Sequence, residues 1–357
     1  MPEGNSRIGR LLSLLSRRRI DLFLCVRMTN IRYLCGFSGS DGVLLASPEG
    51  VTLVTDGRYA EQSRKEVRGA EVVITDRKWA EVRRRVRRTR ASRIGFESRH
   101  VSVEVWRTLS RGREGRWVAL SDPVEGFRMR KGEDEMRALE AAAAAASGAF
   151  LAVLSKGFLG RTESEVAADL EWELKALGAE ESSFRPIVAA GGRAAMPHAV
   201  PTSAKIRRGE AVLFDYGARR GGYCSDESIT VLPERPSARL RRAFDAVLRA
   251  QEVGLRTIRP GVPCREVDAK VRESLDRSGY LKYFVHSTGH GVGLDIHERP
   301  SLSPRSRDRL SEGMVVTVEP GVYVPGVGGI RLEDMVRVTG TRGERITYLP
   351  KTVSRLI

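Results

Sequence analysis

A histidine-rich segment, His286 to Pro300, is the part of the chain whose residue types point most directly to chemistry. It reads HSTGHGVGLDIHERP and holds three of the five histidines of the sequence, His286, His290 and His297. Glycines alternate with these histidines, so the main chain can approach a bound ligand closely. Imidazoles act as general acids, general bases and metal ligands near neutral pH. The segment therefore predicts a loop that lines a binding site, with a plain surface loop as the alternative.

Four acidic residues lie inside stretches that otherwise read as buried strands. They are Asp215 after VLF, Asp226 after YCS, Glu319 after MVVTV and Glu333 after GIRL. Strands disfavour Asp, and a lone buried carboxylate is costly unless it is paired or binds a cation. One such residue is consistent with an arginine partner or a strand-end cap. Four of them beside a histidine-rich segment favour a site for hard cations, and their charge would balance two divalent ions.

The donor atoms restrict which metals such a site would favour. Carboxylate oxygens with one imidazole suit Mn²⁺, Co²⁺, Fe²⁺ or Zn²⁺ better than a thiolate zinc site would. The cysteines do not form a zinc ribbon, because none of them belongs to a CxxC pair. Their apolar surroundings predict buried, reduced thiols in a reducing compartment. The four cysteines are Cys25, Cys35, Cys224 and Cys264.

The N-terminal part of the chain, residues 1–125, alternates short apolar strands with helices. An amphipathic first helix is expected at 6–19. Strands are expected at 21–26, 42–47, 51–56, 71–75, 93–98 and 117–122. This alternation predicts an α/β layer domain. It is not expected to bind phosphate through a glycine-rich loop, because residues 36–42 lack the GxGxxG spacing.

The acids and the histidine-rich segment belong to a second predicted domain, residues 130–357, which follows a proline- and glycine-containing stretch at 122–132. Thr162 and Glu165 form a capping-box pattern at the start of one of its helices. Helices are expected at 133–155, 162–178, 237–258 and 265–279. Strands are expected at 211–217, 221–231, 314–324 and 328–339. These elements predict a strongly bent antiparallel sheet flanked by helices, an α+β domain.

The net charge of +16 is concentrated in segments such as residues 78–93, where Glu81 is the only acid. Such a patch attracts phosphate without sequence specificity. Its single aromatic residue, Trp79, and the lack of a nucleic-acid motif favour a solvated basic face. No apolar run approaches the ~20 residues of a membrane span, and the apolar N-terminal patch is too short for a signal peptide. These features predict a cytoplasmic protein, with an organelle transit peptide as the alternative.

The order and spacing of the acids resemble those of a known family. Asp215 and Asp226 lie in DYGARRGGYCSD, GHGVGLDIHERP follows, and Glu319 and Glu333 bracket PGVYVPGVGGIRL. This pattern is similar to that of the pita-bread metallopeptidases, which include aminopeptidase P, proline dipeptidase and methionine aminopeptidase. The resemblance covers residues 130–357. The first part of the chain resembles the creatinase-type N-terminal domain through NIRYLCGFSGSDG and VTDGRY, which favours the proline-specific branch.

The resemblance implies a dinuclear centre, with Mn²⁺ preferred and Co²⁺, Zn²⁺ or Fe²⁺ as alternatives. Its implied ligands are Asp215, Asp226, His290, Glu319 and Glu333. Asp226 and Glu333 would bridge the two ions. Such ions lower the pKa of water and so supply a nucleophile at neutral pH.

The remaining site residues are also assigned through the resemblance. Glu319 would take the water proton and pass it to the leaving proline nitrogen, and His297 would stabilise the oxyanion. His198 and His286 would orient the peptide, and Arg331 would hold the metal-site carboxylates. His100 is expected to be an ordinary surface residue.

The implied activity is hydrolysis of the bond between an N-terminal residue and proline, as by an Xaa-Pro aminopeptidase. A proline dipeptidase is the alternative, and a homodimer without membrane or nucleic-acid partners is expected. Ile229 stands where the family often has arginine, and Glu227 adds an acid beside a ligand, so metal preference is open. A metal-free creatinase-like enzyme is disfavoured because all five ligands are present. A non-catalytic pita-bread protein that binds nucleic acid or protein through its basic surface is the other alternative.

Overall fold

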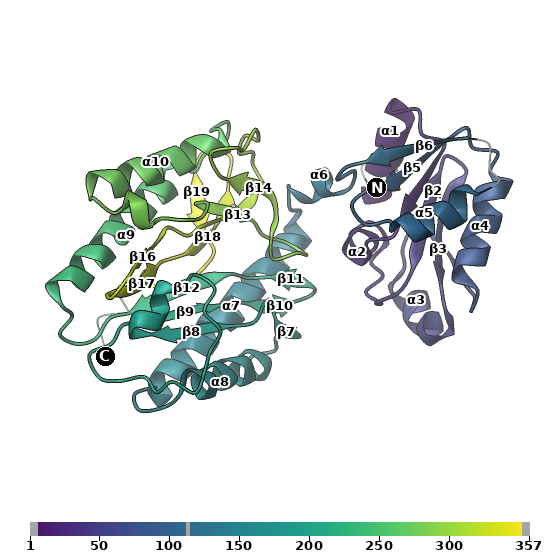
Figure 1. Cartoon of the computed structure of the whole chain (residues 1–357). Coiled ribbons are helices and arrows are strands. Elements are labelled where there is room, and N and C mark those ends of the chain that lie inside the picture. The colour runs from purple at the N-terminus through teal and green to yellow at the C-terminus, as the bar shows by residue number, and fades with distance from the viewer. Residues whose placement is uncertain (1–5, 112–114, 352–357) are drawn as a thin grey trace. The chain divides into compact units, whose positions relative to one another are not determined.

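The computed structural model describes residues 6–111 and 115–351 of the 357-residue chain. The chain divides into two compact units, residues 1–128 and 129–357 (Figure 1). Each unit has a hydrophobic core of its own, formed by apolar residues from its helices and strands. The acids and histidines that the sequence points to all belong to the second unit, apart from His100.

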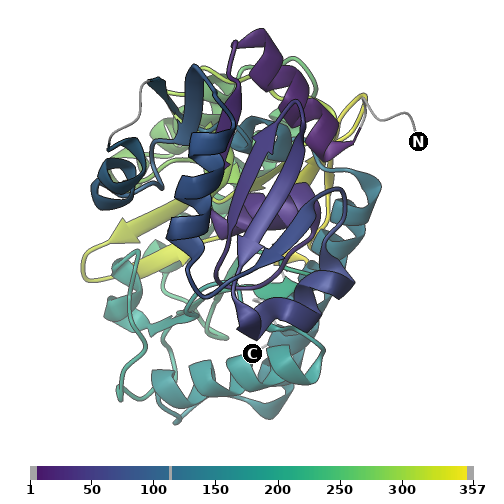
Figure 2. The same ribbon diagram turned by 90° about the vertical axis from the view of Figure 1, so that its right-hand side faces the viewer.

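The first unit is built on a six-stranded mixed sheet of order β4-β3-β2-β1-β5-β6, whose strands run side by side in Figure 2. The strands are β1 (Leu22–Cys25), β2 (Val43–Ser47), β3 (Gly50–Thr55), β4 (Glu71–Ile74), β5 (Arg93–Glu97) and β6 (Arg116–Leu120). β1, β2 and β3 pair in antiparallel fashion, whereas β4, β5 and β6 are each added in parallel. The predicted α/β layer domain is confirmed.

Helices connect these strands. They are α1 (Arg7–Arg17), α2 (Met28–Cys35), α3 (Ala60–Glu66), α4 (Lys78–Arg88), α5 (Val103–Ser110) and the short α6 (Glu125–Arg128). The Ser6 hydroxyl accepts the Gly9 N–H at the start of α1, which satisfies one of the free donors of its first turn. The basic helix α4 buries Val82 and Val86 against the sheet. Its solvent side carries arginines, as a solvated basic face requires.

The second unit has four long helices: α7 (Glu133–Lys156), α8 (Glu163–Ala176), α9 (Ala238–Thr257) and α10 (Cys264–Arg277). Thr162 and Glu165 form the predicted capping box of α8 through reciprocal side-chain to backbone hydrogen bonds. In Figure 1 the strands lie between the pair α7 and α8 and the pair α9 and α10. Two of the hydrophobic clusters of this unit contain residues of these helix pairs, one cluster residues of α7 and α8 and the other residues of α9 and α10.

Four small sheets, rather than one bent sheet, make up the strand layer of the described part of this unit. Their orders are β12-β9-β8, β11-β10-β7, β14-β13-β15-β18-β19 and β16-β17. The first two contain β7 (Glu181–Ser182), β8 (Ile187–Ala190), β9 (Val212–Tyr216), β10 (Ala218–Arg220), β11 (Tyr223–Cys224) and β12 (Glu227–Val231). The others contain β13 (Gly289–Gly291), β14 (Glu298–Leu302), β15 (Val315–Val318), β16 (Gly321–Val324), β17 (Gly328–Arg331), β18 (Asp334–Val338) and β19 (Gly343–Arg345).

Three of the long strands expected from the sequence are each interrupted at an acidic residue. Asp226 lies between β11 and β12, Glu319 between β15 and β16, and Glu333 between β17 and β18. Only Asp215 keeps its place inside a strand, β9. The expectation of continuous strands was wrong because, at each of these acids, the chain leaves one sheet and enters another. The interruptions turn the acidic side chains toward a common space.

Helix α7 is long and apolar enough to cross a membrane, by length and composition alone. Half of its apolar window is buried inside the second unit, where Ala142, Ala146 and Phe150 belong to the core. A core helix therefore accounts for its composition. The four cysteines are buried free thiols, as predicted.

Candidate metal centre

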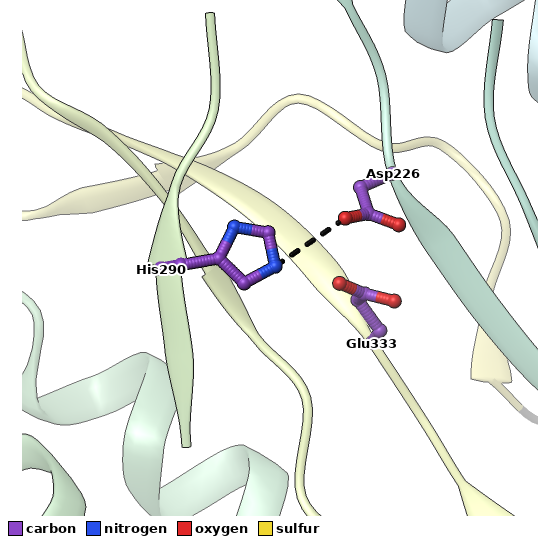
Figure 3. A group of neighbouring side chains, drawn as sticks. All are labelled: Asp226, His290 and Glu333. Atoms are coloured by element: carbon purple, nitrogen blue, oxygen red, sulfur yellow. Dashed lines mark ion pairs between the residues drawn. The ribbon is translucent and has the colours of Figure 1, made fainter. Parts of the chain in front are cut away.

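Asp226, His290 and Glu333 form the centre of the site. One ligand atom of each lies within 4.8 Å of the others. The His290 ring points from β13 toward the two carboxylates, which come from the breaks before β12 and β18 (Figure 3). Nε2 of His290 is 3.5 Å from Oδ2 of Asp226. The histidine-rich segment is thus not a plain loop, because His290 lies in a strand of the five-stranded sheet.

Glu319 joins this group from the break between β15 and β16. Its Oε1 atom is 3.2 Å from Nε2 of His290. The Thr317 hydroxyl holds both residues, because it donates to Oε1 of Glu319 at 3.2 Å and accepts the backbone N–H of His290 at 3.0 Å. Glu319 and Asp226 therefore face the same imidazole nitrogen.

The orientation of His290 makes that nitrogen the one that can bind a cation. Its Nδ1 atom is 3.1 Å from the carbonyl oxygen of Gly291. A carbonyl only accepts hydrogen bonds, so this contact keeps a proton on Nδ1, and Nε2 becomes a metal ligand when it gives up the proton that it shares with Glu319. Such a backbone partner is the usual support of a metal-binding histidine.

Asp215 is fixed beside Glu333 by two side chains. The Ser228 hydroxyl lies 3.0 Å from Oδ1 of Asp215 and 2.8 Å from Oε2 of Glu333. Arg331 forms an ion pair with the other oxygen of Asp215, and its Nε–H donates to the Ser228 hydroxyl at 2.9 Å. Arg331 thus orients Asp215 directly and Glu333 through Ser228.

The carboxylates disfavour one another's ionisation when no cation is present. Burial, followed by the charges of the neighbouring carboxylates, raises the pKa values of Asp226 and Glu333 well above their ordinary range. Burial also opposes ionisation of Glu319, but the hydrogen bond from His290 and the charges of His290 and Arg331 together outweigh it and lower the Glu319 pKa. The buried carboxylates of the centre therefore repel one another, and a bound divalent cation would relieve this repulsion.

The residues present fit a divalent metal ion. Oε1 of Glu333 is buried and has no hydrogen-bond partner among the described residues, although such an atom normally finds one. Four carboxylates and one imidazole supply hard oxygen donors with a single nitrogen, the donor set of Mn²⁺ and related ions. None of the four buried cysteines lines this cavity.

His286 is held in one orientation next to the centre. Its Nδ1–H donates to the Ser287 carbonyl at 2.8 Å, and its Nε2 lies 3.0 Å from the Tyr323 hydroxyl. Tyr323 in turn accepts from Arg331 at 2.7 Å. The three contacts agree on one pattern, in which Tyr323 donates to a neutral His286. Burial lowers the His286 pKa, which keeps the ring neutral near pH 7.

The two other predicted histidines lie at the cavity surface. The His297 ring is 4.3 Å from the His290 ring, centroid to centroid. His297 is largely exposed, and its partial burial, followed by the charge of His290, lowers its pKa. His198 is also exposed and lines the same cavity. Both histidines thus line the cavity that contains the proposed ligands.

One cavity of about 530 Å³ brings together all nine predicted site residues. These are His198, Asp215, Asp226, His286, His290, His297, Glu319, Arg331 and Glu333. The cavity is also lined by apolar residues, Phe184, Pro186, Ile187, Pro197, Val200, Pro201 and Ile296. The site therefore combines a cation-binding wall with apolar surface.

Sequence reasoning missed the residues that support this wall. Ser228, Thr317 and Tyr323 give no sequence signal of their own, because a hydroxyl in a strand is common. The two departures from the family pattern have structural explanations. Ile229 is buried in the core beside α7 and α8, and Glu227 points away from the cavity into a buried polar cluster.

Comparison with known proteins identifies the family of the chain. Residues 134–340 match the model of metallopeptidase family M24, and residues 7–130 match the creatinase/prolidase N-terminal domain. A Xaa-Pro dipeptidase of Pyrococcus furiosus is 33% identical over 96% of this chain and 97% of its own length.

Solved structures agree over nearly the whole chain. A Xaa-Pro dipeptidase from Bacillus anthracis has a TM-score of 0.93 and 39% identity, covering 96% of this chain and 97% of its own. An X-Pro aminopeptidase from Thermotoga maritima has a TM-score of 0.89 and 33% identity, covering 97% and 99%. The second unit thus has the pita-bread fold, and the chain belongs to metallopeptidase family M24, with a creatinase/prolidase N-terminal domain.

Proposed function

We propose that the protein hydrolyses the peptide bond between an N-terminal residue and proline. The observation that carries the proposal is the cavity itself, which a carboxylate–imidazole centre shares with apolar side chains. A Xaa-Pro bond has no N–H on its nitrogen, so an enzyme has to recognise the proline ring by shape. The apolar lining residues supply a surface for the ring, and relatives named Xaa-Pro dipeptidase and X-Pro aminopeptidase share the fold.

The metal ligands are proposed to be Asp215, Asp226, His290, Glu319 and Glu333. Two divalent ions held there, Mn²⁺ in the first place, would lower the pKa of water and polarise the substrate carbonyl. Arg331 keeps Asp215 in position. The predictions of a homodimer and of a cytoplasmic location stay predictions.

The proton transfers are assigned to Glu319. Its carboxylate lines the cavity beside His290, where it can take a proton from the attacking water. It then passes this proton to the proline nitrogen, which must be protonated to leave. His297, beside His290 at the cavity surface, donates a hydrogen bond to the carbonyl oxygen as that oxygen becomes negative. His286 and His198 orient the peptide.

The length of the substrate depends on what meets the carboxyl side of proline. Arg185 lines the cavity and is exposed, and no ion pair of its guanidinium occurs among the described residues. The other lining arginine, Arg331, is committed to Asp215. Arg185 is therefore positioned to pair with the free carboxylate of a Xaa-Pro dipeptide, which favours dipeptidase activity beside the aminopeptidase activity expected from the sequence.

Two substrates test the proposal. The Mn²⁺-loaded protein is assayed with the dipeptide Ala-Pro and with a longer peptide that begins Ala-Pro, and Ala-Ala serves as the control. Cleavage of either proline peptide, without cleavage of Ala-Ala, supports the proposed reaction, and the ratio of the two rates assigns substrate length. Failure to cleave either peptide with Mn²⁺, Co²⁺, Zn²⁺ or Fe²⁺ would overturn it.

A further inference from the structure

A buried lysine lies behind the metal centre. Lys351 exposes 2% of its side chain, and its Nζ atom is 2.7 Å from Oε1 of Glu227 and 3.2 Å from Oδ1 of Asp334. Both carboxylates are completely buried. Lysine is rarely buried to this extent without partners that fix it. Lys351 is thus a buried cation that holds two buried acids together.

These two acids are the immediate neighbours of two proposed metal ligands. Glu227 follows Asp226, and Asp334 follows Glu333. Successive side chains of extended chain point to opposite sides. Asp226 and Glu333 line the cavity, whereas Glu227 and Asp334 point into the core behind it. Lys351 therefore ties together the two segments that carry the ligands, from the side opposite the cavity.

Neighbouring elements anchor each acid independently. Oε2 of Glu227 accepts from Ser147 of α7 at 3.0 Å and from Tyr216 of β9 at 3.2 Å. Oδ2 of Asp334 accepts from Gln251 of α9 at 2.9 Å. The helices on both sides of the strand layer thus hold the two carboxylates, and the ammonium group of Lys351 connects them.

Loss of the lysine charge would leave two buried carboxylates facing each other. Removing one partner of a buried ion pair is costly because the other charge stays uncompensated. Arg345 approaches Oδ2 of Asp334 only to 3.8 Å, with a side chain that is 56% exposed, so it is a poor substitute. The two segments would then move apart, and the attached ligands would move with them.

We propose that Lys351 is a positioning residue that sets the spacing of Asp226 and Glu333, and through it the affinity of the centre for divalent ions. The inference rests on the metal site of the proposed function. Residues that support metal ligands without touching the metal typically contribute about 10–100-fold to metal affinity. A purely structural role, in which Lys351 only fixes its own segment to the core, would instead affect stability alone.

Binding of Mn²⁺ to the metal-stripped, full-length protein separates these roles. Lys351→Met is compared with Lys156→Met, which removes a lysine that also bridges two acids, Glu173 at 2.7 Å and Asp169 at 3.9 Å, but on the surface of α7. Isothermal titration calorimetry gives the affinity. The absorption bands of the Co²⁺-loaded protein report ligand geometry at saturation.

We expect Lys351→Met to weaken Mn²⁺ binding about tenfold and to shift the Co²⁺ bands, and Lys156→Met to change neither. Wild-type Mn²⁺ affinity and unshifted bands in Lys351→Met would overturn the inference, whatever its thermal stability. If Lys351→Met does not fold, Glu227→Gln carries the test, because it weakens the same ion pair isosterically. It should then show a smaller loss in the same direction, and unchanged affinity would contradict the inference.

The outcome also separates this inference from the proposed function. If the wild-type protein binds no Mn²⁺, both the proposed metal site and the role of Lys351 are refuted. If the wild type binds Mn²⁺ and Lys351→Met binds it equally well, only the positioning role of Lys351 is refuted.

Discussion

The imidazole of His290 and the carboxylate of Glu319 approach to 3.2 Å, Nε2 to Oε1, in the wall of the cavity. Without a metal ion, the two side chains form an ion pair. Burial opposes the charge on both, but their contact raises the pKa of His290 and lowers the pKa of Glu319. The same two atoms are the ones offered to a cation. A metal ion must therefore displace the proton that this pair shares, and binding should release protons.

Replacement of Asp226 by Asn should stabilise the metal-free protein and remove its response to metal. The variant keeps the shape of the side chain but removes a buried charge that faces other carboxylates. We expect the free energy of unfolding to rise by about 1–4 kcal/mol without metal, and Mn²⁺ to give no further stabilisation. Thermal unfolding with and without Mn²⁺ measures both effects. A variant that is less stable than the wild type without metal would contradict the proposed repulsion.

The gain from Asp226→Asn should depend on pH. The pKa of Asp226 is raised in the folded protein, mainly by burial and then by Glu333, so the folded state holds the proton more tightly than the unfolded state. The wild type therefore loses stability as pH rises above the unfolded value of about 4, until the folded pKa is passed. The stability difference between the two proteins should be small near pH 4 and should grow toward pH 8. A difference that shrinks with rising pH would be inconsistent with this account.

Replacement of His290 by Ala should weaken metal binding, whereas replacement of His297 by Ala should slow catalysis. His290→Ala removes a proposed ligand, so Mn²⁺ affinity should fall by more than about 100-fold. His297→Ala should leave affinity nearly unchanged but lower kcat by about 10²–10³-fold, the typical effect of losing one oxyanion donor. Calorimetry together with steady-state kinetics at saturating Mn²⁺ tests the division of roles. Equal loss of metal in both variants would refute it.

Arg185→Met should discriminate between substrates by their carboxyl terminus. If Arg185 pairs with the carboxylate of a dipeptide, kcat/KM for Ala-Pro should fall about tenfold, the lower range for a hydrogen bond to a charged group. The value for Ala-Pro amide, which has no carboxylate, should not change. Kinetics on the two substrates measure the ratio directly. An equal fall for both would assign Arg185 to another role.

Tyr323→Phe should impair substrate handling without loss of metal. The Tyr323 hydroxyl links Arg331 to His286, at 2.7 Å and 3.0 Å. Its removal leaves His286 free to turn, so we expect kcat/KM to fall about tenfold while Mn²⁺ affinity stays close to that of the wild type. Tyr348→Phe is the matched control, because Tyr348 is 59% exposed. If Tyr348→Phe lowers kcat/KM equally, the effect does not come from this hydrogen-bond chain.

The sequence predicted the long helices and singled out nine residues that line one cavity, because helix caps and the types of the acids and histidines are local signals. The capping box of Thr162 and Glu165 is one example. It did not predict the interruptions at Asp226, Glu319 and Glu333, because apolar residues on both sides of each acid extend the strand pattern.

The residues that support the metal centre could not be predicted from the sequence either. Glu227 reads as an extra acid beside a ligand, and only the fold shows that Lys351 neutralises it from a distant part of the chain. Contacts of this kind depend on tertiary packing, for which neither residue carries a local pattern. The same holds for Ser228, whose hydroxyl joins Asp215 and Glu333.

The most direct test of the account is the initial rate of Ala-Pro hydrolysis as Mn²⁺ is added to the metal-stripped protein. The account predicts no cleavage before addition, a rate that rises until two equivalents are bound, and complete loss of activity with a chelator. Hydrolysis that persists in the metal-stripped protein, or no hydrolysis at any Mn²⁺ concentration, would contradict it.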